Sequence, residues 1–231
     1  MSWVNVADNA STSIFHSIQV TEPERWERLM LMLNEWMIQT DRARSVVPVT
    51  ADLFVFSYPL FLVWLYGWGI IKATRVWKER ALQVFASAMG TFAVNWVIQL
   101  FGEKSRPEAA VQNQEWLILE HLPTDPFPSD HAAVSMSVAV AVLLIWYHSK
   151  VRWMQYAWCI FLAASIIMSL SRVMVAIHRP TDILVGWWVG ILVAYCIALP
   201  SVSGWLKETV YAWLIRFEEV ITWVLWFKKS T

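Results

Sequence analysis

Long apolar stretches alternate with short polar connections along most of this chain of 231 residues. Five stretches are long enough to cross a bilayer, which takes about 20 mostly apolar residues in a helix. Four of them contain no Lys, Arg, Asp or Glu, and the remaining one carries its ionisable groups in its first turn. The pattern therefore predicts an all-α integral membrane protein, with spans at residues 53–71, 81–101, 129–147, 153–171 and 183–206.

Polar segments flank this apolar core on both sides. In residues 24–37 and 207–224, apolar residues recur at helical spacing among charged ones. Segments of this kind are too charged to span a bilayer and favour amphipathic helices that lie in the interface. We therefore predict a single domain over residues 1–231, with peripheral amphipathic segments at 1–50 and 207–231, one of which is a candidate sixth helix of the bundle.

The composition supports the membrane class. Hydrophobic residues make up 58% of the chain and charged residues 16%, whereas soluble domains average about half and about a quarter. The formal net charge is zero and there is no basic tail, so we expect membrane lipid rather than nucleic acid as a partner. The sequence is compatible with a homodimer. Cys159 and Cys196 fall within apolar spans, which favours buried side chains over a disulfide or a metal site.

Basic residues in the short loops predict the orientation. Lys72, Arg75, Lys78 and Arg80 follow the first span, and two more basic residues follow the third. Because cytoplasmic loops carry an excess of Lys and Arg, we expect this side to face the cytoplasm, although the arginines of the N-terminal segment lie on the other side. The loops at 102–128 and 174–181 then face outward together, in a multi-pass protein of the cell membrane.

Three polar stretches fall on that outer side, although they lie far apart in the sequence. They are GEKSRPE at 102–108, PSDHAA at 128–133 and SRVMVAIHRPTD at 171–182. Because span counting brings all three to one face, we expect their side chains to form one cluster. The candidate site residues are Lys104, Arg106, Ser129, Asp130, His131, Arg172, His178 and Asp182.

The residue types in this cluster suit phosphoryl transfer. Guanidinium groups match phosphate oxygens with a rigid donor fork, and a helix start such as the one expected at Ser129 favours an anion. A neutral imidazole attacks phosphorus, and a carboxylate four residues on, as Asp182 is from His178, holds its other nitrogen. A second imidazole, His131, is able to protonate the leaving oxygen. Taken singly, each residue also has an ordinary structural use as a cap, a turn or a headgroup contact.

The ordered combination resembles the type 2 phosphatidic acid phosphatase superfamily of membrane lipid phosphatases. That family carries Lys-x6-Arg-Pro, Pro-Ser-Gly-His and Ser-Arg-x5-His-x3-Asp, and the third pattern is complete here at 171–182. The second pattern has Asp130 in place of glycine. In the first, Gln99 stands at the position of the lysine, and Lys104 lies two residues before Arg106. The resemblance covers about residues 50–202, with the core motifs at 99–186.

The resemblance implies a phosphatase site that works without a metal or other cofactor. His178 would be the nucleophile that forms a phosphohistidine, Asp182 would orient it, and His131 would act as general acid and then as general base. The phosphoryl oxygens would be bound by Lys104, Arg106, Ser129 and Arg172, with Asp130 beside them.

The PSDH form and the close spacing of Lys104 and Arg106 resemble the undecaprenyl-diphosphatase branch, of the bacitracin-resistance type. This implies hydrolysis of the terminal phosphate of undecaprenyl diphosphate, which recycles the lipid carrier for peptidoglycan and cell-wall synthesis. Three alternatives stay open. They are a phosphatase for phosphatidylglycerol phosphate or phosphatidate, a lipid phosphotransferase, and a catalytically silent lipid-binding or transport relative. The last of these is favoured by Gln99, which stands where the family has a lysine.

Overall fold

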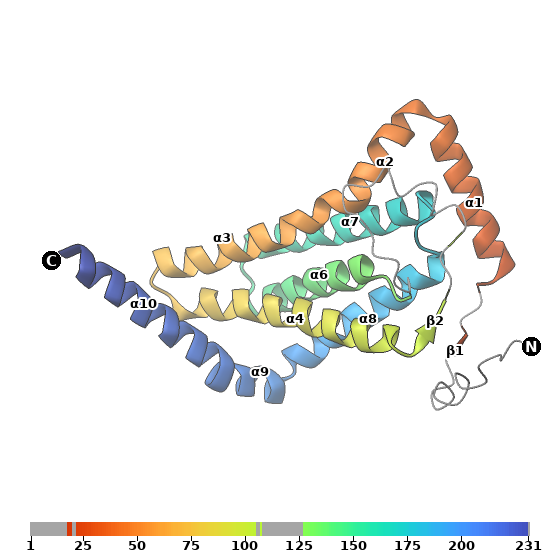
Figure 1. The fold of residues 1–231 in the computed structure, drawn as a ribbon. Helices are drawn as coiled ribbons and strands as arrows, with labels where there is room; N and C mark the ends of the chain where they lie inside the picture. The colour runs from red at the N-terminus through yellow and green to blue at the C-terminus, as the bar shows by residue number, and fades with distance from the viewer. Residues whose placement is uncertain (1–17, 20–21, 105–106, 108–126, 231) are drawn as a thin grey trace, which may run out of the picture.

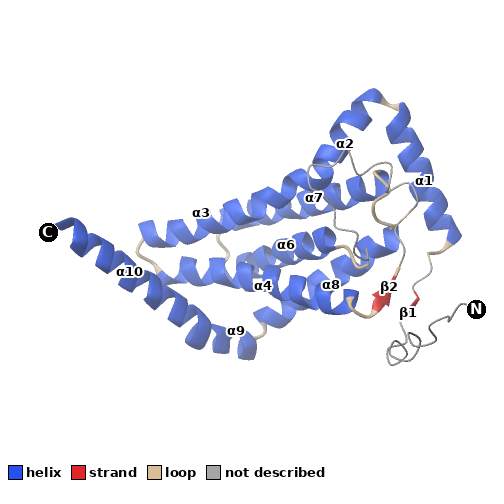
Figure 2. Cartoon of the chain, viewed as in Figure 1, coloured by secondary structure: helices blue, strands red, loops and turns tan. Residues whose placement is uncertain are grey.

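The computed structural model describes residues 18–19, 22–104, 107 and 127–230. Within them, five helices are long and apolar enough to cross a membrane, which confirms the all-α membrane fold. The β structure of the described chain is one parallel pair of two-residue strands, β1 (Ile18–Gln19) and β2 (Gly102–Glu103), shown in Figure 2. The bundle in Figure 1 consists of α3 (Ser57–Ile71), α4 (Arg75–Gln99), α6 (Asp130–Ser149), α7 (Arg152–Met174) and α8 (Pro180–Ala198).

The N-terminal helices lie at one end of the bundle and extend one of its spans. The helix α2 (Asp41–Leu53) continues through the 3-10 turn η1 (Phe54–Phe56) into α3. The first span is therefore Asp41–Ile71, which is longer than the apolar pattern at 53–71 suggested. The amphipathic helix α1 (Glu24–Gln39) packs across the end of α7, where Asn34 Nδ2 donates to the carbonyl oxygen of Met174 at 2.8 Å.

The apolar segment expected at 183–206 forms two helices instead of one. The helix α8 ends at Ala198, and α9 (Pro200–Leu206) begins with a proline at its first position. Leu199 between them has φ −54° and ψ 137°, because a residue that precedes proline is disfavoured in the helical region. A π-helical turn, η3 (Lys207–Tyr211), then leads into the amphipathic helix α10 (Ala212–Ser230). The first part of α10 passes the start of α4, where Glu218 pairs with Lys78, and its C-terminal end extends beyond the bundle in Figure 1.

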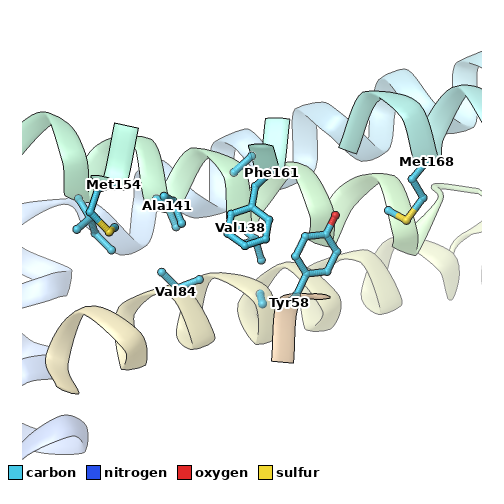
Figure 3. Packing of buried hydrophobic residues seen from close by; sticks show 11 residues of the cluster. Tyr58, Val84, Val138, Ala141, Met154, Phe161 and Met168 are labelled. Atoms are coloured by element: carbon cyan, nitrogen blue, oxygen red, sulfur yellow. The ribbon is translucent and has the colours of Figure 1, made fainter. Parts of the chain in front are cut away.

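The helix α6 forms the centre of the bundle. Of its most apolar window, 61% is buried, more than in any other span of the described chain. Val138 and Ala141 of α6 pack with Val84 of α4 and with Met154 and Phe161 of α7 in the largest hydrophobic cluster, shown in Figure 3. Since lipid is as apolar as these side chains, close van der Waals packing, rather than exclusion from water, holds such helices together.

Two glycines let α8 approach α6 closely. A Cβ atom at Gly190 would lie 2.2 Å from the carbonyl oxygen of Ala133, and one at Gly186 would lie 2.8 Å from that of Ser129. No side chain fits at either position. Because α6 and α8 both begin at the same end of the bundle, this contact places their first turns, and the motif residues in them, side by side (Figure 1).

The two cysteines were expected to be buried, and that expectation is wrong. Cys159 on α7 and Cys196 on α8 are both exposed. Their helices are buried on one stripe only, so a residue inside an apolar span faces either the bundle or the surrounding lipid, and composition alone does not distinguish the two faces.

Substitution of Gly190 by alanine is expected to destabilise the bundle, because the new methyl group would press against the α6 backbone. Overpacking of this kind costs about 1–3 kcal/mol. The matched control is Gly67→Ala on α3, where a Cβ atom meets nothing within 4 Å and better helix propensity favours alanine by up to about 1 kcal/mol. Thermal unfolding of the detergent-solubilised variants would show a lower midpoint for Gly190→Ala only. Equal midpoints would contradict the close helix contact.

Candidate active site

The second and third motifs meet where α6 and α8 begin and α7 ends (Figure 1). The N–H of Ser129, just before α6, donates to the carbonyl oxygen of Asp182 in the first turn of α8 at 3.1 Å. Helix starts leave backbone N–H groups free and carry partial positive charge, so this end of the bundle favours an anion. Ser129 Oγ is buried and has no hydrogen-bond partner among the described residues, which leaves a hydroxyl available at the same place.

His178 lies in the turn between α7 and α8, and 5% of it is exposed. Its Nδ1 lies 3.7 Å from Oδ2 of Asp182, and its Nε2 lies 3.3 Å from Nη2 of Arg172. The same Oδ2 accepts the backbone N–H of Arg179 at 2.8 Å, as part of a capping box at the start of α8. The imidazole therefore has a fixed carboxylate on one side and a guanidinium on the other.

The backbone of this turn is strained and is held by buried contacts. Ala176, two residues before His178, has φ 58°, a left-handed conformation that costs a residue with a Cβ atom about 1–3 kcal/mol. Ala176 packs in a buried cluster with Met30 of α1, and Ile177 packs in another with Met37 of the same helix. Burial of these side chains offsets the strain and keeps His178 in place.

Arg172, in the last turn of α7, forms a buried ion pair. Its Nη1 donates to Oδ1 of Asp52 at 2.7 Å and to the carbonyl oxygen of Ala51 at 3.3 Å. Both charged residues are almost completely buried, with 2% of Arg172 and 0% of Asp52 exposed. The Nε2 of His131 lies 3.6 Å from the same Asp52 oxygen. Asp52, in the last turn of α2, thus brings together Arg172 of the third motif and His131 of the second.

Lys104 contacts Asp182 at Oδ1, whereas His178 lies next to the other carboxylate oxygen, Oδ2. Its ammonium group donates to Oδ1 of Asp182 at 2.6 Å, to Oγ1 of Thr181 at 2.5 Å and to Oε2 of Glu22 at 2.9 Å. A lysine ammonium has three N–H donors, so these three oxygens use all of them. The expectation that Lys104 contacts phosphate stays a prediction, because here the group is engaged with protein oxygens.

Glu22 reaches the site because the N-terminal segment pairs with the segment that follows α4. In the β1–β2 pair, Ile18 is opposite Gly102 and Gln19 is opposite Glu103. Glu22 accepts hydrogen bonds from the backbone N–H of Thr181 at 3.4 Å and from the hydroxyl of the same threonine. A segment outside the three motifs therefore supplies a carboxylate to the lysine that contacts Asp182.

The two departures from the family pattern contact each other. Nε2 of Gln99, at the position of the family lysine, donates to Oδ1 of Asp130 at 3.2 Å and to the carbonyl oxygen of Pro128 at 3.0 Å. Nδ2 of Asn95, one helical turn earlier, donates to the same two oxygens at 2.5 and 3.0 Å. Two amides on α4 thus hold the start of α6. In the family pattern, the position of Gln99 carries a lysine and the position of Asp130 carries a glycine.

The contacts described above connect six of the eight predicted site residues: Lys104, Ser129, His131, Arg172, His178 and Asp182. The carboxylate of Asp130 faces α4 instead, and Arg106 lies outside the described residues. Sequence reasoning missed Asp52, Glu22 and Asn95, which contact the motifs from α2, from the N-terminal segment and from α4. For Asp52 a signal was present. It is an acidic residue directly before an apolar span, at the membrane face of the motifs, and ionisable residues at such places are costly unless they have a partner. The sequence contains no comparable signal for Glu22.

A sequence profile of the PAP2 superfamily matches residues 80–203, more than half of the chain. The chain belongs to the PAP2 superfamily. This confirms the resemblance noted from the motifs and makes the protein a PAP2 membrane phosphatase by family. The match begins after Asp52 and Glu22, so the family profile does not include the two carboxylates that pair with Arg172 and Lys104.

Three curated relatives are similar to this chain. YbjG of Escherichia coli K12, whose name assigns it provisionally to the undecaprenyl-diphosphatases, is 24% identical over 87% of this chain and 99% of its own length. An undecaprenyl-diphosphatase of Sulfolobus acidocaldarius is 32% identical over 39% of this chain and 41% of its own. The bacitracin transport permease protein BcrC of Bacillus licheniformis is 26% identical over 61% of this chain and 66% of its own.

Among solved structures, a transmembrane PAP2-type phosphatidylglycerolphosphate phosphatase from Bacillus subtilis is similar. Its sequence is 20% identical, and the match covers 81% of this chain and 96% of that one with a TM-score of 0.47.

Removal of the Asp52 carboxylate by Asp52→Ala is expected to destabilise the protein, because Arg172 would remain as a buried charge without its nearest counter-ion. Breaking a buried pair in this way costs about 3–5 kcal/mol. Asp41→Ala on the same helix is the control, since Asp41 is exposed and its contribution at a helix start is about 1 kcal/mol or less. Thermal unfolding in detergent would show a much larger drop for Asp52→Ala. Equal drops would mean that the Arg172 charge is compensated elsewhere.

Proposed function

We propose that this PAP2 phosphatase hydrolyses the terminal phosphate of undecaprenyl diphosphate, or of a similar polyprenyl diphosphate, through a phosphohistidine at His178. Two observations support the substrate class. Two of the three similar relatives carry an undecaprenyl-diphosphatase name, and the match to YbjG covers nearly the whole length of both chains. The chain is also a membrane protein, so a lipid tail has apolar helix surfaces to follow at the level of the site.

The arrangement around His178 carries the proposal. Nδ1 faces the Asp182 carboxylate and Nε2 faces Arg172. A carboxylate near Nδ1 favours the tautomer with the proton on that nitrogen, which leaves the lone pair on Nε2. The nucleophilic nitrogen is then on the side where a guanidinium binds phosphate oxygens. The 3.7 Å separation of Nδ1 and Oδ2 is expected to shorten with substrate bound, as hydrogen bonds of catalytic groups do.

In the first step, the Nε2 lone pair of His178 attacks the terminal phosphorus, and a P–N bond forms. The bond between that phosphorus and the bridging oxygen breaks, and His131 donates a proton to the departing undecaprenyl phosphate. Arg172 and Ser129, with Arg106 from the first motif, bind the oxygens of the transferring group, on which negative charge spreads in the transition state. Asp182 stabilises the positive charge that develops on His178.

In the second step, water attacks the phosphohistidine. His131, now neutral, accepts a proton from that water, the P–N bond breaks, and inorganic phosphate leaves with His178 restored. Asp52 has a part in both steps, because its Oδ1 lies 3.6 Å from His131 Nε2 and 2.7 Å from Arg172 Nη1. A carboxylate at this place stabilises the protonated histidine that the first step needs.

We propose that the site faces outward in the cell membrane. The basic residues Lys72, Arg75 and Arg80 lie at the end of the bundle opposite His178, around the α3–α4 connection. The excess of Lys and Arg on cytoplasmic loops favours this orientation. In it, the protein would release phosphate outside the cell and leave undecaprenyl phosphate in the outer leaflet.

The test is phosphate release by the purified protein, in EDTA, from undecaprenyl diphosphate and phosphatidylglycerol phosphate in parallel. We expect a strong preference for the diphosphate and a loss of at least about a thousandfold in His178→Ala, because the nucleophile is gone. Substrate labelled at the terminal phosphorus and quenched in base would leave label on the wild-type protein and none on His178→Ala.

Other outcomes separate the alternatives. Preference for the glycerolipid would keep the mechanism and change the substrate. Full activity in His178→Ala, at an unfolding midpoint equal to that of wild type, would overturn the phosphohistidine. Release from neither lipid would favour the binding or transport relative.

For Lys104, we infer that it acts by holding Asp182 rather than by binding phosphate directly. Lys104→Gln is then expected to lower kcat about 100-fold with little change in KM, since a misplaced Asp182 no longer orients His178. The control is Lys78→Gln, which breaks another buried lysine–carboxylate pair, with Glu218, at the opposite end of the bundle. A rise in KM at unchanged kcat would instead support direct phosphate binding by Lys104.

A further inference from the structure

A cavity lies at the end of the bundle away from His178. It has a volume of about 420 Å³ and lies between the first turns of α4, the end of α6 and the α8–α9 junction. The helix α6 has 20 residues, so its two ends are about 30 Å apart. A phosphate headgroup in the active site therefore does not reach this cavity.

The cavity adjoins an apolar crevice of about 390 Å³. The two share Leu144, His148, Ala198 and Pro200 as lining residues, so they are adjacent. We refer to the pair as the hollow, with the cavity as its polar half and the crevice as its apolar half. Leucine, alanine and tyrosine side chains dominate the crevice, whereas the cavity combines apolar side chains with the charged residues Glu79, Arg80 and Lys207. A pocket with charged side chains next to an apolar one fits an amphiphile, with its headgroup in the first and its tail in the second.

The charges of the polar half favour an anion. Arg80 and Lys207 line it, and neither makes an ion pair with any residue of the described chain. The guanidinium of Arg80 lies over the ring of Trp77, 4.3 Å from its centroid, and is half-buried. The carboxylate among the described lining residues, Glu79, accepts a hydrogen bond from Arg75 at 2.7 Å and is thereby neutralised. Two cations beside a cavity, both without a counter-ion, match a phosphate group.

The hollow lies at the membrane surface. It lies where three candidate spans end, at Arg75, Ser149 and Ala198, which is the level of lipid headgroups. Tyr147 and Tyr195, which line the crevice, are 60% and 50% exposed on the bundle surface, as aromatic residues at a membrane interface are. The apolar half therefore opens towards the bilayer.

We propose that this hollow is a second lipid site, in which Arg80 and Lys207 bind the phosphate of an anionic phospholipid and the crevice holds part of its tail. The α8–α9 junction contributes Ala198 and Pro200 to both halves, and Lys207, directly after α9, lines the cavity. The bound lipid would join α4, α6 and the α8–α9 junction at the end of the bundle away from the catalytic residues. The proposal does not depend on the reaction at His178.

Native mass spectrometry of the purified full-length protein in detergent would test this, with phosphatidylglycerol and phosphatidylcholine as probes. Each cation near a membrane surface contributes about 1 kcal/mol, or about fivefold in affinity. The double variant Arg80→Gln, Lys207→Gln is therefore expected to bind phosphatidylglycerol about 20-fold more weakly and to lose its preference over phosphatidylcholine. The matched control, Arg152→Gln with Arg216→Gln, removes the same charge from exposed positions that do not line the cavity.

A third variant and a third probe address the tail. Ala198→Phe fills the wall that the two halves share, and should weaken the binding of both phospholipids with the charges intact. Inorganic phosphate at millimolar concentration should not displace phosphatidylglycerol. The proposal is overturned if the control loses as much binding as the cavity variant, or if neither loses any. Displacement by inorganic phosphate, with binding unaffected by Ala198→Phe, would show an ion site instead of a lipid site.

Discussion

Charged groups withdrawn from water at a membrane face are stable only when opposite charges meet them, and this requirement shapes the end of the bundle that holds His178. Each buried ion costs several kcal/mol unless it is paired and hydrogen-bonded. In this protein Glu22, Lys104 and Asp182 alternate in sign on one side of His178, and Arg172 and Asp52 do so on the other. Each of these side chains is at most 3% exposed. The pairs are therefore as much a condition of folding as a source of chemistry.

The partners in these pairs come from segments that only the bundle brings together. Asp52 is at the end of α2, Arg172 at the end of α7 and Asp182 at the start of α8. The glycine contacts between α6 and α8 fix one side of the arrangement, and the packing of α1 over the strained turn at Ala176 fixes the other. Small residues and buried methionines thus determine how accurately the charged groups meet.

The sequence predicted the features that follow from the order and spacing of residues along the chain. Apolar length identified all five spans, and the fixed spacing of Arg172, His178 and Asp182 identified the third motif, because those residues lie on one turn and two adjoining helix ends. It did not show that Asp52 pairs with Arg172 or Glu22 with Lys104, because these partners are 120 and 82 residues apart and no spacing relates them. It misplaced the end of the fifth span because Pro200 interrupts an apolar run that hydrophobicity alone treats as continuous.

The contact of Gln99 and Asn95 with Asp130 has a consequence for how family patterns are compared. A motif written as a string treats its positions as separate, but these side chains form one hydrogen-bonded unit across α4 and α6. A chain with the carboxylate and no amides would hold a half-buried charge without donors, and one with the amides alone would hold donors without that acceptor. A lysine at 99 would still donate to that carboxylate, whereas a glycine at 130 would leave both amides with the carbonyl oxygen of Pro128 as the acceptor. The effect of a substitution at either position therefore depends on which residue stands at the other.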